Sequence, residues 1–159
     1  MFPPFLSRAA LAGATATLAL GIGVAEAGEC PREHVLSTPR AIENAPDVGV
    51  ARETLSVVNI TGYRGVGNLR LRTRLLTIAV GGIVPFHTHE DRPSIVYILS
   101  GEIIEHSRTC AVPIVHRAGE HAAEYGAQEA HWWENRTGQP VVILSSDVLP
   151  PEMLDFPEM

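Results

Sequence analysis

The chain has 159 residues, 45% of them hydrophobic and 19% charged, so it is long enough for one domain with a buried core. Its formal net charge is −6 and all 12 basic residues are arginines, which leaves no basic surface for nucleic acid or an anionic membrane. Fourteen glycines and 12 prolines predict short strands and frequent turns rather than a helical bundle.

The N-terminus has the pattern of a secretory signal peptide. Residues 9–25 form an uncharged run after Arg8, and Ala25-Glu26-Ala27 resembles a cleavage site with a small residue on each side of the glutamate. We therefore expect residues 1–27 to be removed, and the mature protein to be periplasmic or secreted with no membrane attachment. The alternative is an uncut membrane anchor, although the run is slightly short for a span.

Two cysteines remain in the mature chain, Cys30 and Cys110. An even cysteine count in an exported protein favours a disulfide between them. The alternatives are two unpaired thiols or a ligating role for Cys110.

The mature chain predicts an all-β fold. Residues 28–52 contain polar breakers without a clear period, and we expect an irregular arm there. Short segments of strand character then follow, separated by glycine, proline or asparagine, at 53–60, 69–75, 95–99, 102–106, 111–116, 130–134 and 141–146. A turn is expected at Gly81-Gly82. This spacing predicts an antiparallel sandwich or small barrel over residues 53–148, with a tail at 149–159.

The segment 69–75 alternates strictly between apolar and polar residues, so its arginines share one face of a strand. They are Arg70, Arg72 and Arg74. We expect this face to be the solvated outer one. The alternative places one of the three arginines at the mouth of a pocket.

His87 and His89 are two residues apart on a predicted strand, so their imidazoles point to the same face. Such a pair often begins a transition-metal site. The alternative is a pair of surface or mutually hydrogen-bonded histidines.

Two motifs resemble those of the cupin superfamily. The first has a glycine, a His-X-His and a closing glycine, and the second ends in a histidine followed after three residues by an asparagine. The matching positions are Gly81, His87, His89 and Gly101 in the first motif, and Gly119, His131 and Asn135 in the second. The Pro-X-Gly of the second motif is missing, and Gly126 and Gln128 stand there. The resemblance covers residues 68–148 and implies a double-stranded β-helix barrel with an internal pocket.

The resemblance also implies a metal site, with one departure. Ser94 stands where most cupins carry a glutamate ligand. Glu90 follows His89 directly and should point away from the metal face, and Asp91 would reach inward only through an irregular loop. We therefore expect a site of three histidines alone, as in the thiol dioxygenases of the family, formed by His87, His89 and His131. Imidazoles suit a divalent transition metal, whether Fe, Zn, Cu, Ni or Mn, better than Mg or Ca.

Residues whose side chains share a strand face with the predicted metal site are expected to line its pocket. They are Ser94, Val96, Ile98 and Trp133, although Trp133 is equally consistent with ordinary core. Three neutral ligands would leave the ion its full charge in an apolar pocket, so we expect an anionic, chelating ligand.

Several other residues are assigned supporting roles. His106, His116 and His121 match no motif and are expected to be surface or hydrogen-bonded structural residues. Asn135 is expected to fix a turn, Tyr97 to point away from the site, and Arg92 with Pro93 to gate the mouth.

The leading functional hypothesis is an exported, metal-dependent cupin that acts on a small anionic molecule, with oxygen-dependent cleavage at iron as the first chemistry to test and isomerisation as the second. One alternative is a non-catalytic protein that binds a small ligand or a metal, and another is an interaction protein with a vestigial site. A homodimer is an expected assembly.

Overall fold

The computed structural model describes residues 28–42 and 45–155, so the predicted signal peptide lies outside the described residues. The strands are β1 (Val48–Asn59), β2 (Arg70–Ser100), β3 (Glu102–Ser107), β4 (Ile114–Arg117), β5 (His121–Glu134) and β6 (Val141–Leu149). Short 3-10 turns lie at η1 (Arg32–His34), η2 (Tyr63–Gly65) and η3 (Pro151–Met153). No helix in this part of the chain has the length and hydrophobicity to cross a membrane. The predicted all-β fold is confirmed.

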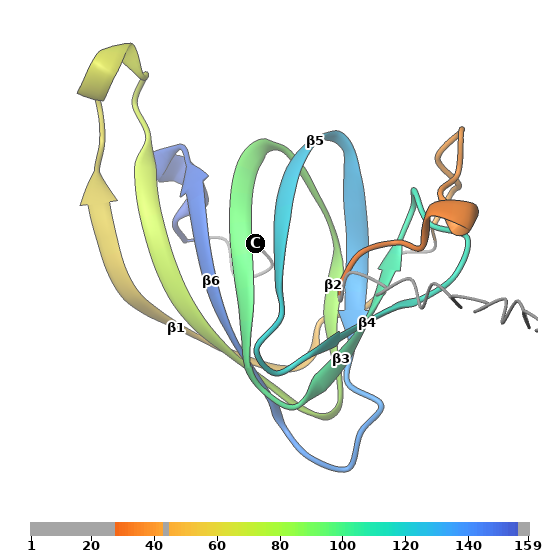
Figure 1. Cartoon of the computed structure of the whole chain (residues 1–159). Helices are drawn as coiled ribbons and strands as arrows, with labels where there is room; N and C mark the ends of the chain where they lie inside the picture. Colours follow the sequence, from red (N-terminus) through yellow and green to blue (C-terminus); the bar gives the residue numbers. More distant parts are fainter. Residues whose placement is uncertain (1–27, 43–44, 156–159) are drawn as a thin grey trace, which may run out of the picture.

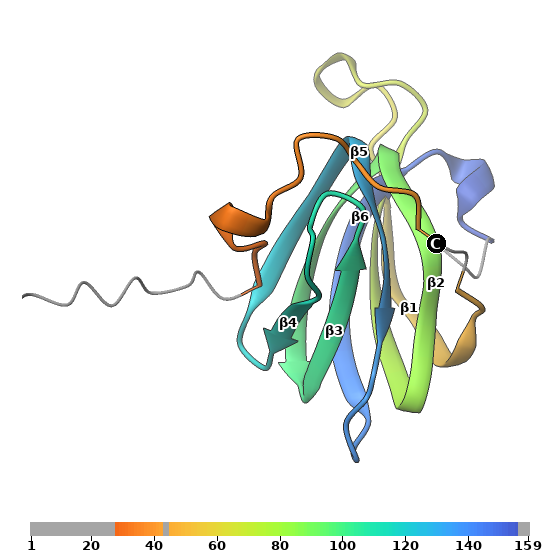
Figure 2. The same ribbon diagram turned by 90° about the vertical axis from the view of Figure 1, so that its right-hand side faces the viewer.

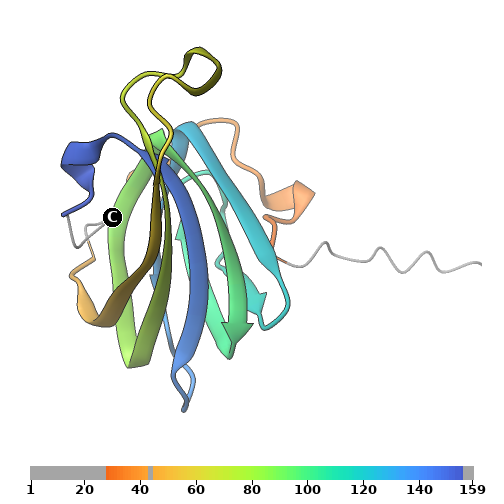
Figure 3. The same ribbon diagram turned by 90° about the vertical axis from the view of Figure 1, so that its left-hand side faces the viewer.

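The strands form one antiparallel sheet in which β2 has the central position. The order is β1-β2-β5-β3-β4, and β6 pairs with both the first and the last part of β2. Because one strand pairs with both parts of β2, the sheet must bend back on itself, and its two walls face each other across the interior (Figure 1). The side views show β3, β4 and β5 along one wall, and β1 and β6 along the other (Figures 2 and 3).

The strands differ from the sequence prediction mainly in where they begin and how far they continue. The segments 69–75 and 95–99 belong to one strand, β2, and β5 begins at His121 rather than at residue 130. β1 begins at Val48, inside the segment expected to be an arm. Gly81 and Gly82 lie within β2 rather than in a separate turn, and they coincide with a register shift between β1 and β2. Gly81 has a φ of 72°, and a Cβ at Gly82 would come within 2.7 Å of Ile78 Cγ2. The two glycines therefore bend a strand that continues through them.

The arginine face of β2 points inward, contrary to the favoured expectation. Arg72 and Arg74 are buried at 1% and 5% exposure, whereas Leu71, on the opposite face, is 39% exposed. Asp147 of β6 is the register partner of Arg72 and supplies the counter-charge that makes this burial possible. The hydrophobic core lies further along the barrel and consists of Leu76, Ile78, Val84, Val96, Ile98, Ile103, Trp133, Val141 and Ile143.

The N-terminal arm is fastened to the barrel beside the start of β4. Cys30 and Cys110 form the predicted disulfide, with a sequence separation of 80 residues. Backbone hydrogen bonds from Leu36 to Thr109 and from Ala111 to His34 continue the attachment. The disulfide therefore joins the arm to a buried point, since Cys110 is fully buried.

Replacing both cysteines with serine is expected to lower the free energy of unfolding by about 2–4 kcal/mol, because the crosslink restricts a long loop in the unfolded chain. Urea unfolding of parent and variant measures the difference, and the parent treated with a reductant should match the variant. An unchanged unfolding free energy in the variant would contradict this expectation.

Candidate metal centre

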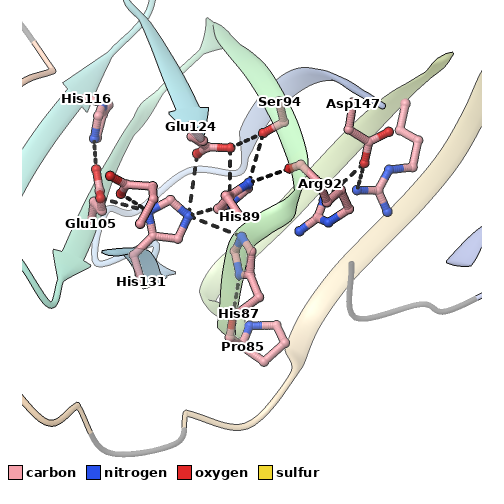
Figure 4. A network of polar contacts seen from close by, with 12 residues as sticks. Pro85, His87, His89, Arg92, Ser94, Glu105, His116, Glu124, His131 and Asp147 are labelled. Atoms are coloured by element: carbon pink, nitrogen blue, oxygen red, sulfur yellow. Dashed lines mark hydrogen bonds and ion pairs between the residues drawn. The ribbon is translucent and has the colours of Figure 1, made fainter. Parts of the chain in front are cut away.

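Three histidine side chains meet inside the barrel. His87 and His89 come from β2, and His131 comes from β5, where it is the register partner of His87. The Nε2 atom of His131 lies 3.1 Å from Nε2 of His89 and 3.2 Å from Nε2 of His87 (Figure 4). The structure thus brings together the three ligands that the two motifs predict.

Each of the three rings is held through its other nitrogen by an oxygen acceptor. Nδ1 of His87 donates to the Pro85 carbonyl at 2.9 Å, Nδ1 of His89 to the Arg92 carbonyl at 3.1 Å, and Nδ1 of His131 to Glu105 at 2.8 Å. A carbonyl or carboxylate oxygen can only accept, so the proton of each neutral ring is on Nδ1. All three Nε2 lone pairs therefore point at one another, an arrangement that a shared cation would stabilise.

The electrostatics of the centre agree with a bound cation. Burial and the neighbouring charge of His131 lower the pKa of His89 to about 3, and burial holds the pKa of His87 well below its ordinary value. Burial alone would also lower the pKa of His131, but Glu124 and Glu105 raise it. The two acidic side chains therefore favour a positive charge beside His131, and a metal ion would supply that charge in place of a proton.

The spacing of the ligand atoms fits a single ion. Imidazole nitrogens bound to one transition metal at about 2.0–2.1 Å are separated by roughly 3.0–3.4 Å. The Nε2 atom of His131 lies 3.1 Å from that of His89 and 3.2 Å from that of His87, and both distances fall in this range. All three rings also have the fixed orientation that metal-ligating histidines receive from outer hydrogen-bond partners.

A buried carboxylate that the sequence analysis missed stands beside the histidines. Glu124 of β5 lies 3.4 Å from Nε2 of His89 and 3.5 Å from Nε2 of His131. Its Oε2 accepts a hydrogen bond from the hydroxyl of Ser94, which is its register partner on β2. The expected group of three histidines is present, and Glu124 adds an acidic side chain beside it from the strand that pairs with Ser94.

Irregular pairing explains why strand parity did not indicate Glu124. The register of β2 against β5 runs from Thr88 opposite Ala130 to His89 opposite Gly126, which leaves residues 127–129 unpaired as an extra segment. Such a bulge changes which side chains face inward, so the alternation that holds near His131 does not extend to Glu124. The only signal in the sequence was the missing ligand at Ser94, which indicates a substitute but not where it lies.

A second carboxylate supports the centre from behind. Glu105 of β3 accepts hydrogen bonds from Nδ1 of His131 and, at 2.7 Å, from Nε2 of His116. Burial alone would raise the pKa of Glu105, but these hydrogen bonds lower it to about 2. His116 is fully buried and stacks on Trp133. The expected structural role of His116 is confirmed, and its contact with Glu105 connects it to the metal centre.

The other predicted structural residues lie away from the centre. His106 stacks on Trp132 and pairs with Glu134, and His121 is exposed. Asn135 fixes a turn as expected, since its side chain bonds the backbone at Ala79, Thr137 and Gln139.

A small pocket adjoins the histidines. Among the residues expected to line it, Ser94, Val96 and Trp133 do so, next to His87, His89 and Glu124. Ile98 does not line the pocket. It faces inward as its parity predicted, but it lies opposite Ile143 deeper along β2 and is fully buried in the core. Tyr97 points outward as expected and is 43% exposed.

The pocket also reaches a group of buried charges. Arg72, Arg74 and Arg92 all contact the Asp147 carboxylate, at 2.7, 3.4 and 3.0 Å. Figure 4 shows Arg92 beside Asp147. Burial alone would raise the pKa of Asp147, but the hydrogen bond from Arg72 and the three positive charges lower it. The expectation that Arg92 gates the mouth is wrong, because Arg92 is 2% exposed and held in this cluster. We call these four residues the arginine cluster.

Comparisons with known proteins agree on the architecture. No established family profile matches the sequence, and no curated protein matches it. KdgF from Halomonas sp. superposes with a TM-score of 0.51 at 15% identity, over 67% of this chain and 84% of KdgF. An uncharacterized conserved protein with a double-stranded β-helix domain from Klebsiella pneumoniae gives 0.49 at 19% identity, over 74% of this chain and 84% of that protein. A cupin domain from Bordetella pertussis gives 0.47 at 13% identity, over 65% of this chain and 97% of that domain.

Identities this low establish the fold and nothing about activity. The sheet that closes on β2 and the superposition on KdgF lead to the same assignment. The chain has the double-stranded β-helix fold that its motifs predicted.

Proposed function

We propose that the chain is an exported metal-binding cupin that acts on a small anionic molecule in the pocket beside the metal. The observation that carries the proposal is the convergence of three Nε2 lone pairs whose orientation is fixed by Pro85, Arg92 and Glu105. Buried polar groups arranged in this way need a cation between them.

The donor set indicates which ions fit. His87, His89, His131 and Glu124 offer three nitrogens and one carboxylate, a combination suited to Fe, Mn, Zn, Cu or Ni. When bound, such an ion supplies Lewis acidity and, in the case of iron, oxygen chemistry. Four protein ligands on an ion that takes six leave two positions for a chelating ligand.

The surrounding residues prepare the pocket for a small polar molecule. Val96 and Trp133 are apolar and almost fully buried, so they exclude water from one side of the site. Ser94 holds Glu124 in place. Oxygen uptake with candidate substrates separates a dioxygenase from the alternative, a non-catalytic binding protein that holds the same ligand without turnover.

Export and dimer formation belong to the same proposal. The disulfide between Cys30 and Cys110 supports an oxidising compartment, as does the signal-like sequence at 1–27. β1 exposes Leu55, Val57 and Val58 by 43–50% along an edge of the sheet, which supports a homodimer formed there.

The metal site is tested by measuring the metal content of the protein purified from the periplasm. We expect about one equivalent of a divalent transition metal in the parent and a loss of most of it in His131→Ala. That substitution removes one ligand and also the Nδ1–H group that donates to Glu105. His121→Ala is the matched control, since His121 lies exposed on the same strand. Equal metal contents in the two variants, or a parent that cannot be loaded with any of these ions, would overturn the proposal.

A further inference from the structure

Arg92 is a buried cation with unused hydrogen-bond donors. Its Nη1 donates to Asp147 at 3.0 Å, but among the described residues nothing accepts a hydrogen bond from its Nε or Nη2. The side chain is 3% exposed, so water does not freely replace the missing partners. Unpaired buried donors on a charged group are costly, and such groups in a pocket indicate an absent ligand.

Arg92 shares its carboxylate partner with other guanidinium groups. Among the described residues, Asp147 contacts Arg92 at 3.0 Å, Arg72 at 2.7 Å and Arg74 at 3.4 Å. Because its oxygens are already engaged by these contacts, Asp147 does not satisfy Nε and Nη2 of Arg92. An added anion would therefore be attracted to these two donors.

The position of Arg92 relates its unpaired donors to the metal centre. Arg74 and Arg92 line the pocket that His87 and His89 also line, with Arg52 at its margin. Figure 4 shows Arg92 lying between His89 on one side and Asp147 on the other. The pocket volume is about 40 Å³, which at about 10–15 Å³ for each water admits only a compact ligand.

We infer that the pocket binds a small 2-hydroxy or 2-oxo carboxylic acid, whose carboxylate accepts hydrogen bonds from Arg92 and whose other oxygen faces the histidines. A carboxylate matches the planar donors of a guanidinium group and compensates the buried charge of Arg92. The orientation of the second oxygen rests on the proposed metal site, but the carboxylate subsite does not. The preference for an anion thus arises from the unpaired donors of Arg92 and does not depend on the charge of a metal ion.

Glycolate is a suitable probe because glycolamide has nearly the same shape and no charge. Titration of metal-free protein, prepared with a chelator, is followed by the NMR signals of the arginine Nε–H groups. We expect glycolate to shift the Arg92 signal with saturation, and glycolamide to bind at least ten-fold more weakly. Arg92→Lys keeps the charge but loses the planar donors, and is expected to weaken glycolate binding at least ten-fold. Arg117→Lys is the control, since Arg117 is 60% exposed and pairs only with Glu102 among the described ion pairs.

The same titration with zinc-loaded protein separates this inference from the proposed function. If both hold, glycolate binds more tightly with zinc than without it, and Arg92→Lys weakens binding in both forms. Binding that needs zinc and is unaffected by Arg92→Lys would overturn the carboxylate subsite and leave the metal site standing. Equal binding of glycolate and glycolamide to the parent would also overturn it, a comparison that remains valid if the variant fails to fold. Glycolate binding without any effect of zinc would instead count against the metal end of the pocket.

Discussion

Asp147→Asn is expected to lower the free energy of unfolding by about 3–5 kcal/mol, because removing one partner of a buried ion pair leaves uncompensated charge. Asp147 is 1% exposed and is the common acceptor for Arg72, Arg74 and Arg92. An asparagine has nearly the same shape, so the cost arises from charge and hydrogen bonding rather than from a cavity. Urea unfolding at neutral pH measures it.

The same carboxylate predicts an acid dependence of stability. Its pKa in the folded protein is lowered below the ordinary 3.8, so the folded state binds its proton less readily than the unfolded chain does. The stabilisation from Asp147 is therefore complete above about pH 4 to 5 and declines as the pH falls through the folded-state pKa. The difference in unfolding free energy between the parent and Asp147→Asn should consequently be smaller near pH 3 than at pH 7.

Asp47→Asn is the matched control. Asp47 forms an ion pair with Arg52 at 2.9 Å, but its side chain is 32% exposed. Ion pairs of this kind contribute about 0–1 kcal/mol because solvent screens them. If the two asparagine variants lose the same amount of stability, or if the parent-to-variant difference for Asp147 does not change with pH, the buried cluster does not have the energetic role assigned to it.

The segment 69–75 shows what an alternating sequence pattern can predict and what it cannot. Strict alternation correctly indicated a strand with all three arginines on one face, since β2 includes Arg70, Arg72 and Arg74. Alternation alone does not state which face is inside, and arginine is ordinarily exposed. The deciding partner, Asp147, is 75 residues from Arg72 in the sequence and becomes its neighbour only through the pairing of β2 with β6.

The three histidines were easier to predict from the sequence than the acidic residue beside them. His87 and His89 share a face by the geometry of any strand, and the motif spacing brought in His131 from β5. Glu124 and Ser94 are also register partners, but this pairing follows an interruption in both strands: residues 90–93 on β2 and 127–129 on β5 have no partner across that ladder. Local patterns carry no information about such interruptions, so the carboxylate could not be located before the strands were paired.

The depth of a side chain within the barrel also could not be predicted from the sequence. Val96 and Ile98 have the same parity and both point inward, yet only Val96 lines the pocket. The difference of two residues is about 6.5 Å along a strand, enough to move from the pocket into the core beneath it. Parity gives the face of a strand, whereas depth depends on where the opposite wall closes, here through Ile143 and its neighbours on β6.

Glu124→Gln is expected to weaken metal binding by more than the 10–100-fold typical of losing an outer hydrogen-bond partner. Burial raises the pKa of Glu124, and a bound cation would favour its ionised form. The substitution keeps the size of the side chain but removes this ionisable group, whose oxygens lie 3.4 Å from His89 Nε2 and 3.5 Å from His131 Nε2. Competition with a chromophoric chelator for Zn²⁺ or Co²⁺ measures the change. Glu129→Gln is the control, because Glu129 lies 3.7 Å from Nδ1 of His131, on the side away from the convergent nitrogens.

A second test moves the carboxylate to position 94, where most cupins carry a glutamate ligand. Ser94→Glu alone is expected to weaken metal binding, because it places a second carboxylate opposite Glu124 in a buried site and removes the hydroxyl that Glu124 accepts from. Combining Ser94→Glu with Glu124→Ser exchanges the two side chains across the strand pair and should recover most of the affinity that Glu124→Ser loses. The exchange tests the pairing as well as the charge, since a carboxylate reaches the same ion from either strand only if positions 94 and 124 face it together. If Glu124→Gln binds metal as tightly as Glu129→Gln, the ion is held by the three histidines alone and Glu124 serves only the hydrogen bond with Ser94.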